Sequence, residues 1–182
     1  MMKKTIMFIG AGKYQLPGIE KAKEIGLKVI AIDRDLDAPG FKVADVPVVL
    51  DVTDIEGAIK IAKENDIDGI LTVASDIAVP TVAAVAEELG LPGISPEVAK
   101  IATNKALMRE KFIEHGVPSP KFRKVRTLDE AREAVEKIGA PVVIKPVDNA
   151  GSRGVSKIDK IDGLIDAFYH AQKHSRVDDV IV

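Results

Sequence analysis

The feature that most constrains the fold is the regular alternation of two apolar patterns along residues 1–95. Short runs rich in β-branched residues are apolar on both faces at residues 5–9, 28–32, 46–50 and 69–73. Such runs are typical of buried strands in a parallel sheet. Apolar residues at helical spacing fill the stretches between them, for example from Leu16 to Ile25. Repeats of this length predict right-handed βαβ crossovers and an α/β fold with a doubly wound parallel sheet.

The composition excludes several classes of function. Hydrophobic residues make up 46% and charged residues 30% of the chain, as is typical of a globular protein. The net charge of −2 provides no basic field, so neither nucleic acid nor an anionic membrane is an expected partner. The absence of cysteine excludes disulfides, thiolate chemistry and cysteine-ligated zinc. No apolar run reaches membrane-spanning length and the first is too short for a signal peptide, so a cytoplasmic location is expected.

Ligands of such sheets bind beyond the carboxyl ends of the strands, where three segments are candidates. The candidate substrate residues in two of them are Gly10, Ala11, Gly12, Gln15, Ser75 and Asp76. Asp33, in the third, lies about 20 residues after Gly12, which is the spacing of the ribose-binding acid in a dinucleotide site. Gln15 replaces the third glycine of that fingerprint, which disfavours nicotinamide binding. The glycines leave two interpretations equally open, a tight strand-to-helix turn and a small-ligand site.

Two further patterns imitate metal sites without completing them. Alternating aspartates from Asp33 to Asp37 look like the start of a calcium loop, but Ala38 stands where that loop requires glycine. His170 and His174 lie four residues apart, without the glutamate that follows the first histidine in zinc proteases. We therefore expect a solvated turn and solvated histidines near a helix end, and we assign no metal ligand.

From residue 95 onward the pattern changes to that of a small α+β unit. Predicted helix N-caps are Ser95, Asn104 and Thr127, the last in a capping box that opens a helix at residues 131–138. The prolines within residues 117–120 predict an extended linker. Apolar runs predict strands at residues 142–146, 155–158 and 180–182, and helical spacing predicts a helix at 161–174. We assign a doubly wound domain to residues 1–95, a connecting segment to 96–104 and an α+β domain to 105–182.

The most informative stretch of the second half is VVIKPVDNAGSRGV, residues 142–155. Its strand ends on Lys145, and Gly151 and Gly154 then flank Ser152 and Arg153. N–H groups exposed by glycines, together with such donors, form an anion-binding nest. A plain hairpin turn is the alternative on these residues alone.

Three motifs in order cover essentially the whole chain. They are GAGKYQLPGIEKAKEIGLKVIAIDRDLDAPG, ISPEVAKIATNKALMREKFIEHGVPSPKF and PVVIKPVDNAGSRGV. As a set with this order and spacing, they resemble the N-terminal part of ATP-grasp enzymes, in which a Rossmann-like preATP-grasp domain precedes the first ATP-grasp subdomain. The resemblance is to carbamoyl phosphate synthase large chains, purine-pathway carboxylase and formyltransferase homologues, and amino-acid ligases.

The resemblance implies ATP as the cofactor and indicates the residues that bind it. Lys105 and Lys145 match two lysines that contact the nucleotide phosphates. The residues that match the mobile loop over the β- and γ-phosphates are Asn149, Ala150, Gly151, Ser152, Arg153 and Gly154. The segments at Gly10 and Ser75 would contribute substrate contacts. In the family, a carboxylate attacks the γ-phosphate to give an acyl phosphate that an amine displaces, with Mg²⁺ bridging phosphate oxygens.

The resemblance departs from the family pattern at the end of the sequence. After a run like residues 179–182 the family places a glutamate, adenine contacts and the acidic residues that hold magnesium, and this sequence contains none of these. We therefore assign no catalytic residue, and we expect the N-terminal portion of a ligase for a small carboxylate or amine, with the C-terminal part of the fold missing and no activity alone. The alternative is a non-catalytic nucleotide-binding or partner subunit of a split enzyme. An unpaired strand at 180–182 would then seek a complementing polypeptide or a second copy.

Overall fold

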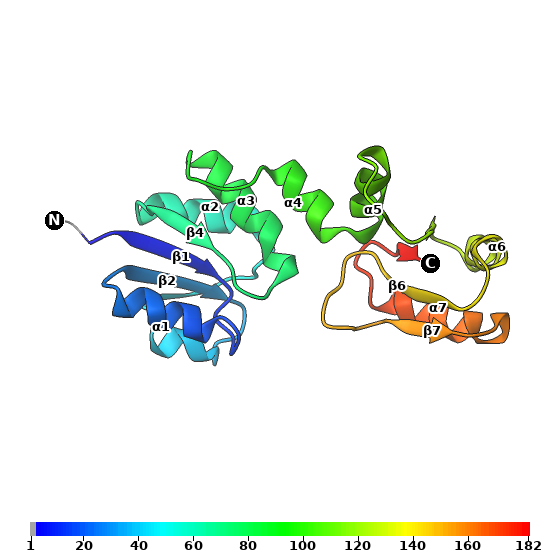
Figure 1. The fold of residues 1–182 in the computed structure, drawn as a ribbon. Helices are drawn as coiled ribbons and strands as arrows, with labels where there is room; N and C mark the ends of the chain where they lie inside the picture. The colour runs from blue at the N-terminus through cyan, green and yellow to red at the C-terminus, as the bar shows by residue number, and fades with distance from the viewer. Residues whose placement is uncertain (1–2) are drawn as a thin grey trace. The chain divides into compact units, whose positions relative to one another are not determined.

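The computed structural model describes residues 3–182, and the chain divides between Ala99 and Lys100 into two compact units (Figure 1). The division falls within α4 (Pro96–Thr103), so the stretch expected to connect the domains is largely helical. The Ser95 hydroxyl caps this helix by accepting a hydrogen bond from the Val98 N–H at 3.2 Å. Each unit is described by itself below.

The first unit is built on a four-stranded parallel sheet with the strand order β3-β2-β1-β4. Its strands are β1 (Thr5–Ile9), β2 (Lys28–Asp33), β3 (Val46–Val49) and β4 (Gly69–Leu71). Its helices are α1 (Leu16–Glu24), α2 (Ile55–Glu64) and α3 (Val79–Glu88), and the short 3₁₀ turns are η1 (Pro39–Lys42) and η2 (Asp76–Ala78). The predicted doubly wound parallel sheet is confirmed.

Helices cover both faces of this sheet because its strands alternate apolar side chains between the two faces. Met7 and Ile9 point to the face that α2 and α3 cover. Phe8, between them, points to the opposite face, where Ile19 and Ala22 of α1 pack. Burial on both faces explains why the strand sequences are apolar throughout and not alternating.

The second unit carries a four-stranded antiparallel sheet with the strand order β5-β8-β6-β7. Its strands are β5 (Lys124–Val125), β6 (Val142–Pro146), β7 (Ser156–Ile158) and β8 (Val180–Ile181). Its helices are α5 (Lys105–Glu114), α6 (Leu128–Ile138) and α7 (Leu164–Lys173), with the 3₁₀ turn η3 (Ile161–Gly163) before the last. The core under this sheet is formed by α6 and α7, with Leu164 and Phe168 fully buried against Ile144. The predicted α+β unit is confirmed.

Local signals placed most element starts correctly. The capping box is present, with the Thr127 hydroxyl accepting from the Glu130 N–H at 3.2 Å and the Glu130 carboxylate accepting in return. This cap begins α6 at Leu128, three residues before the predicted start. The predicted helix at 161–174 is a 3₁₀ turn followed by α7.

The expectation of an unpaired strand at residues 180–182 is wrong. β8 lies inside the sheet, between β5 and β6, where Ile181 pairs with both Lys124 and Lys145. Val180 is fully buried, and the Val182 N–H and carbonyl both bond to the Arg123 backbone, at 2.9 and 3.0 Å. The sequence did not predict this arrangement, because β5 has only two residues and does not form an apolar run. This strand therefore offers no edge to a complementing polypeptide.

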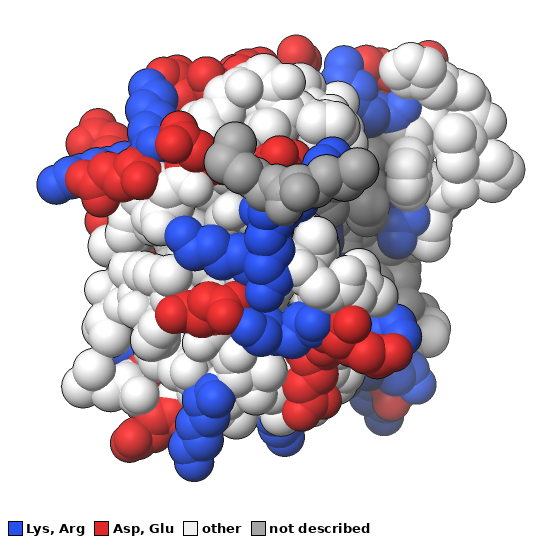
Figure 2. All heavy atoms as spheres, turned by 90° about the vertical axis from the view of Figure 1, so that its left-hand side faces the viewer, with Lys and Arg blue, Asp and Glu red and all other residues white. Residues whose placement is uncertain are grey.

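Charges of both signs are interspersed on the face shown in Figure 2, without a field of one sign. Exposed charged groups of the described residues pair locally, for example Lys21 with Glu24 at 2.7 Å and Lys63 with Glu88 at 2.5 Å. Such exposed pairs contribute little to stability. Across residues 3–182, no helix has the length and apolar character needed to span a membrane.

Candidate functional site

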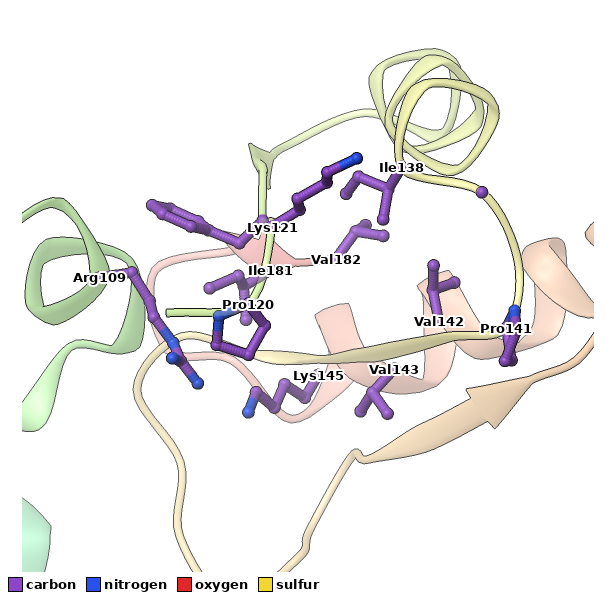
Figure 3. A pocket seen from close by; sticks show the side chains of 12 residues that line it. Arg109, Pro120, Lys121, Ile138, Pro141, Val142, Val143, Lys145, Ile181 and Val182 are labelled. Atoms are coloured by element: carbon purple, nitrogen blue, oxygen red, sulfur yellow. The ribbon is translucent and has the colours of Figure 1, made fainter. Parts of the chain in front are cut away.

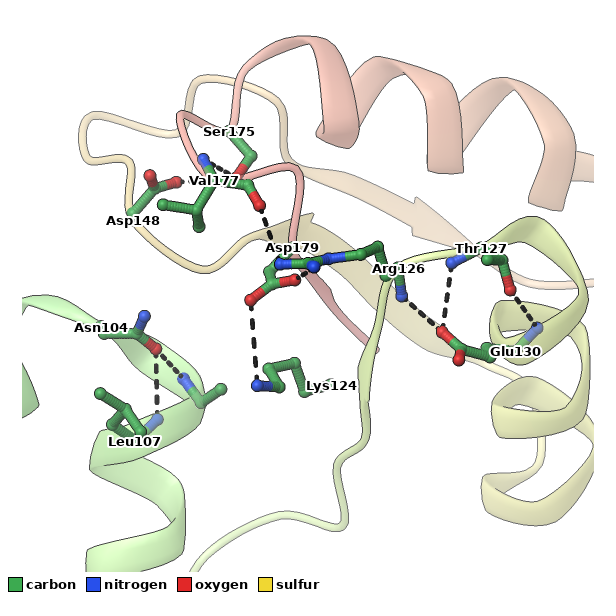
Figure 4. Close-up of polar contacts among 11 residues, drawn as sticks. Asn104, Leu107, Lys124, Arg126, Thr127, Glu130, Asp148, Ser175, Val177 and Asp179 are labelled. Carbon is green, nitrogen blue, oxygen red and sulfur yellow. Dashed lines mark hydrogen bonds and ion pairs between the residues drawn. The ribbon is translucent and has the colours of Figure 1, made fainter.

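The N-terminus of α5 brings Lys105 to the segment that follows β6. The Asn104 side-chain oxygen caps the helix by accepting from the N–H groups of Ala106 and Leu107, at 3.0 and 3.2 Å (Figure 4). The Lys105 N–H donates to the Val147 carbonyl at 2.8 Å, and the buried Ala106 packs against Val147. From this fixed backbone, the Lys105 ammonium donates to the carbonyl oxygen of Asn149. Two of the predicted nucleotide-binding positions are thereby brought together.

Lys145 lies on β6 with its side chain half-buried. Burial lowers the pKa of its ammonium, and the neighbouring positive charges of Arg109 and Lys105 lower that pKa further. We call these three residues the cation cluster. Positive groups held together in a partly desolvated place are stabilised when an anion binds among them.

Arg109 is the member of the cation cluster that sequence reasoning missed. It lies on α5, and its guanidinium donates to the Ser119 hydroxyl at 2.8 Å, which fixes its direction. A signal was available, because residues four apart on a helix share a face and Arg109 follows Lys105 by four.

The glycine loop, residues 149–154, has a backbone that turns in the left-handed region. Gly151, Ser152 and Gly154 have φ of 67°, 58° and 74°. A β-carbon added to Gly151 would meet nothing within 4 Å, and residues 151–153 are exposed. The Arg153 guanidinium turns back to donate to the Ala150 carbonyl at 3.1 Å. Successive backbone N–H groups in a turn can form the concave arrangement that binds anions.

A cavity of about 500 Å³ opens beside the cation cluster (Figure 3). Arg109 and Lys145 line one part of it, and their nitrogens are seen near one another in Figure 3. The remaining lining is mainly apolar and consists of Pro120, Lys121, Phe122, Ile138, Gly139, Pro141, Val142, Val143, Ile181 and Val182. An apolar cavity with cations on one side suits a ligand that has a flat apolar part and an anionic part.

The candidate residues of the first unit are engaged in holding its fold. Gln15 is only 7% exposed, and its side-chain N–H donates to the carbonyl of Val73 beyond β4. The Ala11 N–H donates to the Asp33 carboxylate at 2.8 Å, so the carboxylate expected to bind ribose in a dinucleotide site is already occupied by the turn. Gln15 therefore joins the ends of β1 and β4 and is not directed at a ligand.

The other candidates in the first unit lie next to this connection. Ser75 follows Val73 by two residues and accepts, through its carbonyl, the Ala78 N–H at 3.2 Å that begins η2. The Asp76 side chain is exposed. The topology thus brings the two predicted substrate segments together at the carboxyl ends of β1 and β4.

The patterns that imitated metal sites have other partners in the structure. The rings of His170 and His174 lie with centroids 4.7 Å apart and planes tilted by 53°, and His174 Nδ1 lies 2.8 Å from the His170 carbonyl oxygen. Within residues 3–182 no group of three or more His, Cys, Asp or Glu side chains is placed to hold a metal ion. The described residues therefore do not fit a resident magnesium ion.

Comparison with known families divides the chain much as the structure does. The family described as the ATP-grasp N-terminal domain matches residues 19–93. The family described as the carbamoyl-phosphate synthase L chain, ATP binding domain, matches residues 100–181.

Curated relatives carry the name formate-dependent phosphoribosylglycinamide formyltransferase. The protein from Methanocaldococcus jannaschii is 30% identical over 97% of this chain and 46% of its own length. The protein from Wolinella succinogenes is 32% identical over 95% of this chain and 45% of its own. The chain therefore spans a little under half the length of these relatives.

Solved structures show the same partial correspondence. The L-amino acid ligase from Bacillus licheniformis superposes with a TM-score of 0.77 and 27% identity, over 100% of this chain and 44% of the ligase. The ADP complex of N5-carboxyaminoimidazole synthetase from Staphylococcus aureus superposes with a TM-score of 0.80 and 19% identity, over 99% of this chain and 48% of the synthetase. This likeness shows a common fold. With both family matches and both units accounted for, this chain belongs to the ATP-grasp superfamily and corresponds to the N-terminal part of its members.

Proposed function

We propose that this chain binds ATP through Lys105, Arg109, Lys145 and the glycine loop. In a complete enzyme it would serve as the N-terminal portion of a ligase that couples ATP cleavage to carbon–nitrogen bond formation. The observation that carries the proposal is the cation cluster, whose member Lys105 contacts Asn149 at the start of a loop with three positive φ angles. The same cluster borders the apolar cavity, which has room for the nucleoside.

Each group has a distinct part in binding the polyphosphate. Lys105 uses one of its donors on the Asn149 carbonyl, which leaves its other ammonium hydrogens for phosphate oxygens. Arg109 is held by Ser119 through one nitrogen and presents the rest of its guanidinium fork, which matches phosphate geometry. Lys145 is already partly desolvated, so its attraction to phosphate is weakened less by water. The glycine loop would donate hydrogen bonds from its backbone N–H groups to the phosphate oxygens.

The reaction class follows from the family and stays a proposal for this chain. The printed names of its relatives include a formyltransferase, an amino acid ligase and a 2-oxoglutarate carboxylase biotin carboxylase domain in complex with MgADP and bicarbonate. In the family that the sequence resembles, ATP activates a carboxylate, and we propose a small carboxylate or bicarbonate as the substrate here. The first unit would present the backbone of residues 10–12 and the side chains of Ser75 and Asp76 to it, because Gln15 is committed to Val73.

The test is an NMR titration of the chain with ATP, with and without Mg²⁺ in solution. Because the chain spans under half of its relatives, we expect weak binding, with a Kd near about 1 mM, and no ADP production. Amide shifts should cluster at Lys105, Lys145 and the glycine loop. They should vanish for Lys145→Met and persist for Lys160→Met, a matched change of an exposed lysine in the same unit.

Two results would overturn the assignment. One is the absence of any amide shift up to about 10 mM ATP. The other is a set of shifts confined to residues 10–15 and 73–76, which would place the nucleotide in the first unit. Tight binding with turnover by the chain alone would instead contradict the expectation that the activity requires more than this part of the fold.

A further inference from the structure

Both ends of the glycine loop contact one other segment of the second unit. That segment is the α7–β8 connection, residues 174–179, which links the end of α7 to β8. The contacts lie at Asp148 and Asn149 before the loop tip and at Gly154 after it. The residues between them, 150–153, have no hydrogen bond to the connection among the bonds of the described residues.

Asp148 is joined to the connection by both carboxylate oxygens. One oxygen accepts from the Ser175 hydroxyl at 3.0 Å, and the other accepts from the Arg176 N–H at 2.9 Å. Figure 4 shows the Asp148 side chain directed at the Ser175–Val177 stretch. A carboxylate that accepts from a backbone N–H forms one of the stronger hydrogen bonds in proteins.

Asn149 is held in the same way by both ends of its amide. Its side-chain nitrogen donates to the His174 carbonyl at 2.9 Å, while its side-chain oxygen accepts from the Ala150 N–H at 2.9 Å. With both ends of the amide engaged, the Asn149 side chain is not directed at a phosphate. The match of residues 149–154 to a loop over the phosphates stays a prediction, in which the Asn149 side chain holds the loop to the protein.

Gly154 closes the far end of the loop against the same connection. It is buried, and a β-carbon added there would lie 2.7 Å from the His174 β-carbon. The close approach requires glycine independently of the backbone conformation. His174 therefore contacts both ends of the loop, through its carbonyl at Asn149 and through its β-carbon at Gly154.

The connection is itself fixed to the sheet. The Asp179 carboxylate, mostly buried, accepts from Arg126 at 2.8 Å and lies 3.9 Å from the Lys124 ammonium. Its carbonyl accepts from the Val147 N–H at 3.3 Å. The contacts therefore run without a break from β5, through residues 174–179, to the base of the glycine loop.

We propose that Asp148 and Asn149 are positioning residues that anchor the glycine loop to the α7–β8 connection, so that only residues 150–153 move when the loop covers a nucleotide polyphosphate. The inference rests on the proposed ATP site, and it assigns residues 174–179 a part in that site although they do not touch the ligand. Anchoring both ends lowers the conformational entropy lost when the tip closes, and so favours binding. It also limits the closing movement to a four-residue tip.

The first experiment needs no nucleotide. Backbone order parameters from ¹⁵N relaxation should be about 0.85 at residues 148, 149 and 154 and below about 0.6 at the tip. Asn149→Ala should lower the values at 149 and 154, and Ser175→Ala should lower those at 148 and 149. Ser175→Thr keeps the hydroxyl and should restore them. The matched control is Asp159→Asn, an exposed aspartate of the same unit outside the anchor.

The second experiment separates positioning from general stability. Asn149→Ala should raise the Kd for ATP about tenfold, the loss expected for roughly one good hydrogen bond. The Kd for AMP should stay within about twofold, because AMP has no β- or γ-phosphate for the loop to cover. Equal losses for ATP and AMP would overturn the positioning role, as would mobility in the unmodified chain that is the same at residues 148, 149 and 154 as at the tip.

The two proposals can fail separately. If the order parameters change as expected but Lys145→Met leaves ATP binding intact, the anchor stands and the nucleotide assignment is wrong. If Lys145→Met abolishes ATP binding but Asn149→Ala changes neither the order parameters nor the affinity, the nucleotide site stands and the anchor is wrong.

Discussion

The chain contains two glycine-bearing segments at the ends of strands, and they differ in what surrounds them. The turn at residues 10–15 is enclosed: Ala11 bonds through its N–H to Asp33 and through its carbonyl to the Gly40 N–H, and Gln15 lies beneath both glycines. The glycine loop is anchored at its ends and open at its tip, where a β-carbon added to Gly151 would meet nothing within 4 Å.

The difference shows that glycine serves two separate needs. Close approach is the need at Gly40, which packs on the turn of the first unit: a β-carbon there would lie 2.8 Å from the Ala11 carbonyl oxygen, although the backbone needs no left-handed conformation. Gly10, within that turn, has a φ of 100°, and a β-carbon there would lie 3.3 Å from the Gln15 side chain. In the glycine loop, glycine permits positive φ, at Gly151 without any crowding and at Gly154 together with crowding. A turn that is packed with side chains stabilises the fold, whereas a turn that is exposed to solvent can bind a ligand.

The largest effect is expected for Gly154→Ala. The substitution combines a left-handed backbone with a β-carbon 2.7 Å from that of His174 and 3.1 Å from the Pro146 ring. Strain and overpacking together should destabilise the second unit by about 3 kcal/mol. Native-state hydrogen exchange, read separately on peptides from each unit, measures this. Unchanged exchange throughout residues 100–182 would show that the loop is not packed against the connection.

Gln15→Ala should have the next largest effect, and it should fall on the other unit. The substitution removes the hydrogen-bond donor to the Val73 carbonyl and leaves a cavity beside Gly10 and Gly12. The free energy of unfolding of the first unit should therefore fall by about 2 kcal/mol. ATP affinity should not change. The matched control is Gln172→Ala, a half-buried glutamine in the second unit whose bond to the Arg126 carbonyl is 3.3 Å, with an expected cost of less than about 0.5 kcal/mol. A loss of ATP affinity in the Gln15 variant would mean that the enclosed turn does bind the nucleotide.

Much of this arrangement could be predicted from the sequence, because its signals are local. Apolar strands covered on both faces identified the parallel sheet, and the caps at Asn104 and Thr127 identified the helix starts. What escaped depends on contacts between distant residues. β8 was taken for an edge because its partner β5 has two residues, and Arg109 joined the cation cluster through its direction from α5. The hydrogen bond of Gln15 also escaped, because its partner is a backbone carbonyl 58 residues away.

Gly151→Ala isolates the positive φ from crowding and should cost about 1 kcal/mol of stability in the second unit. Gly151→Asn is the matched control, because asparagine tolerates the left-handed region and should cost less than alanine. Hydrogen exchange on the same peptides measures both variants. A cost for alanine as large as that of Gly154→Ala would mean that the loop tip is packed and not open, which would remove the contrast between the two segments.

The smallest expected effect is the pH dependence of ATP affinity. It tests whether the anion binds beside Lys145 and the glycine loop and not in the turn at residues 10–15. Burial and the charges of Arg109 and Lys105 hold the pKa of Lys145 below its ordinary value of 10.5. A bound polyphosphate stabilises the ammonium and raises that pKa, so binding takes up a proton wherever Lys145 of the free chain is neutral. ATP affinity should therefore fall as pH rises through the Lys145 pKa of the free chain, by less than about tenfold up to pH 10. Lys145→Arg cannot titrate in this range, so calorimetry between about pH 8 and 10 should find a flatter pH dependence and less proton uptake. An equally steep dependence in this variant would mean that Lys145 is not beside the phosphates and that the open loop is not where the anion binds.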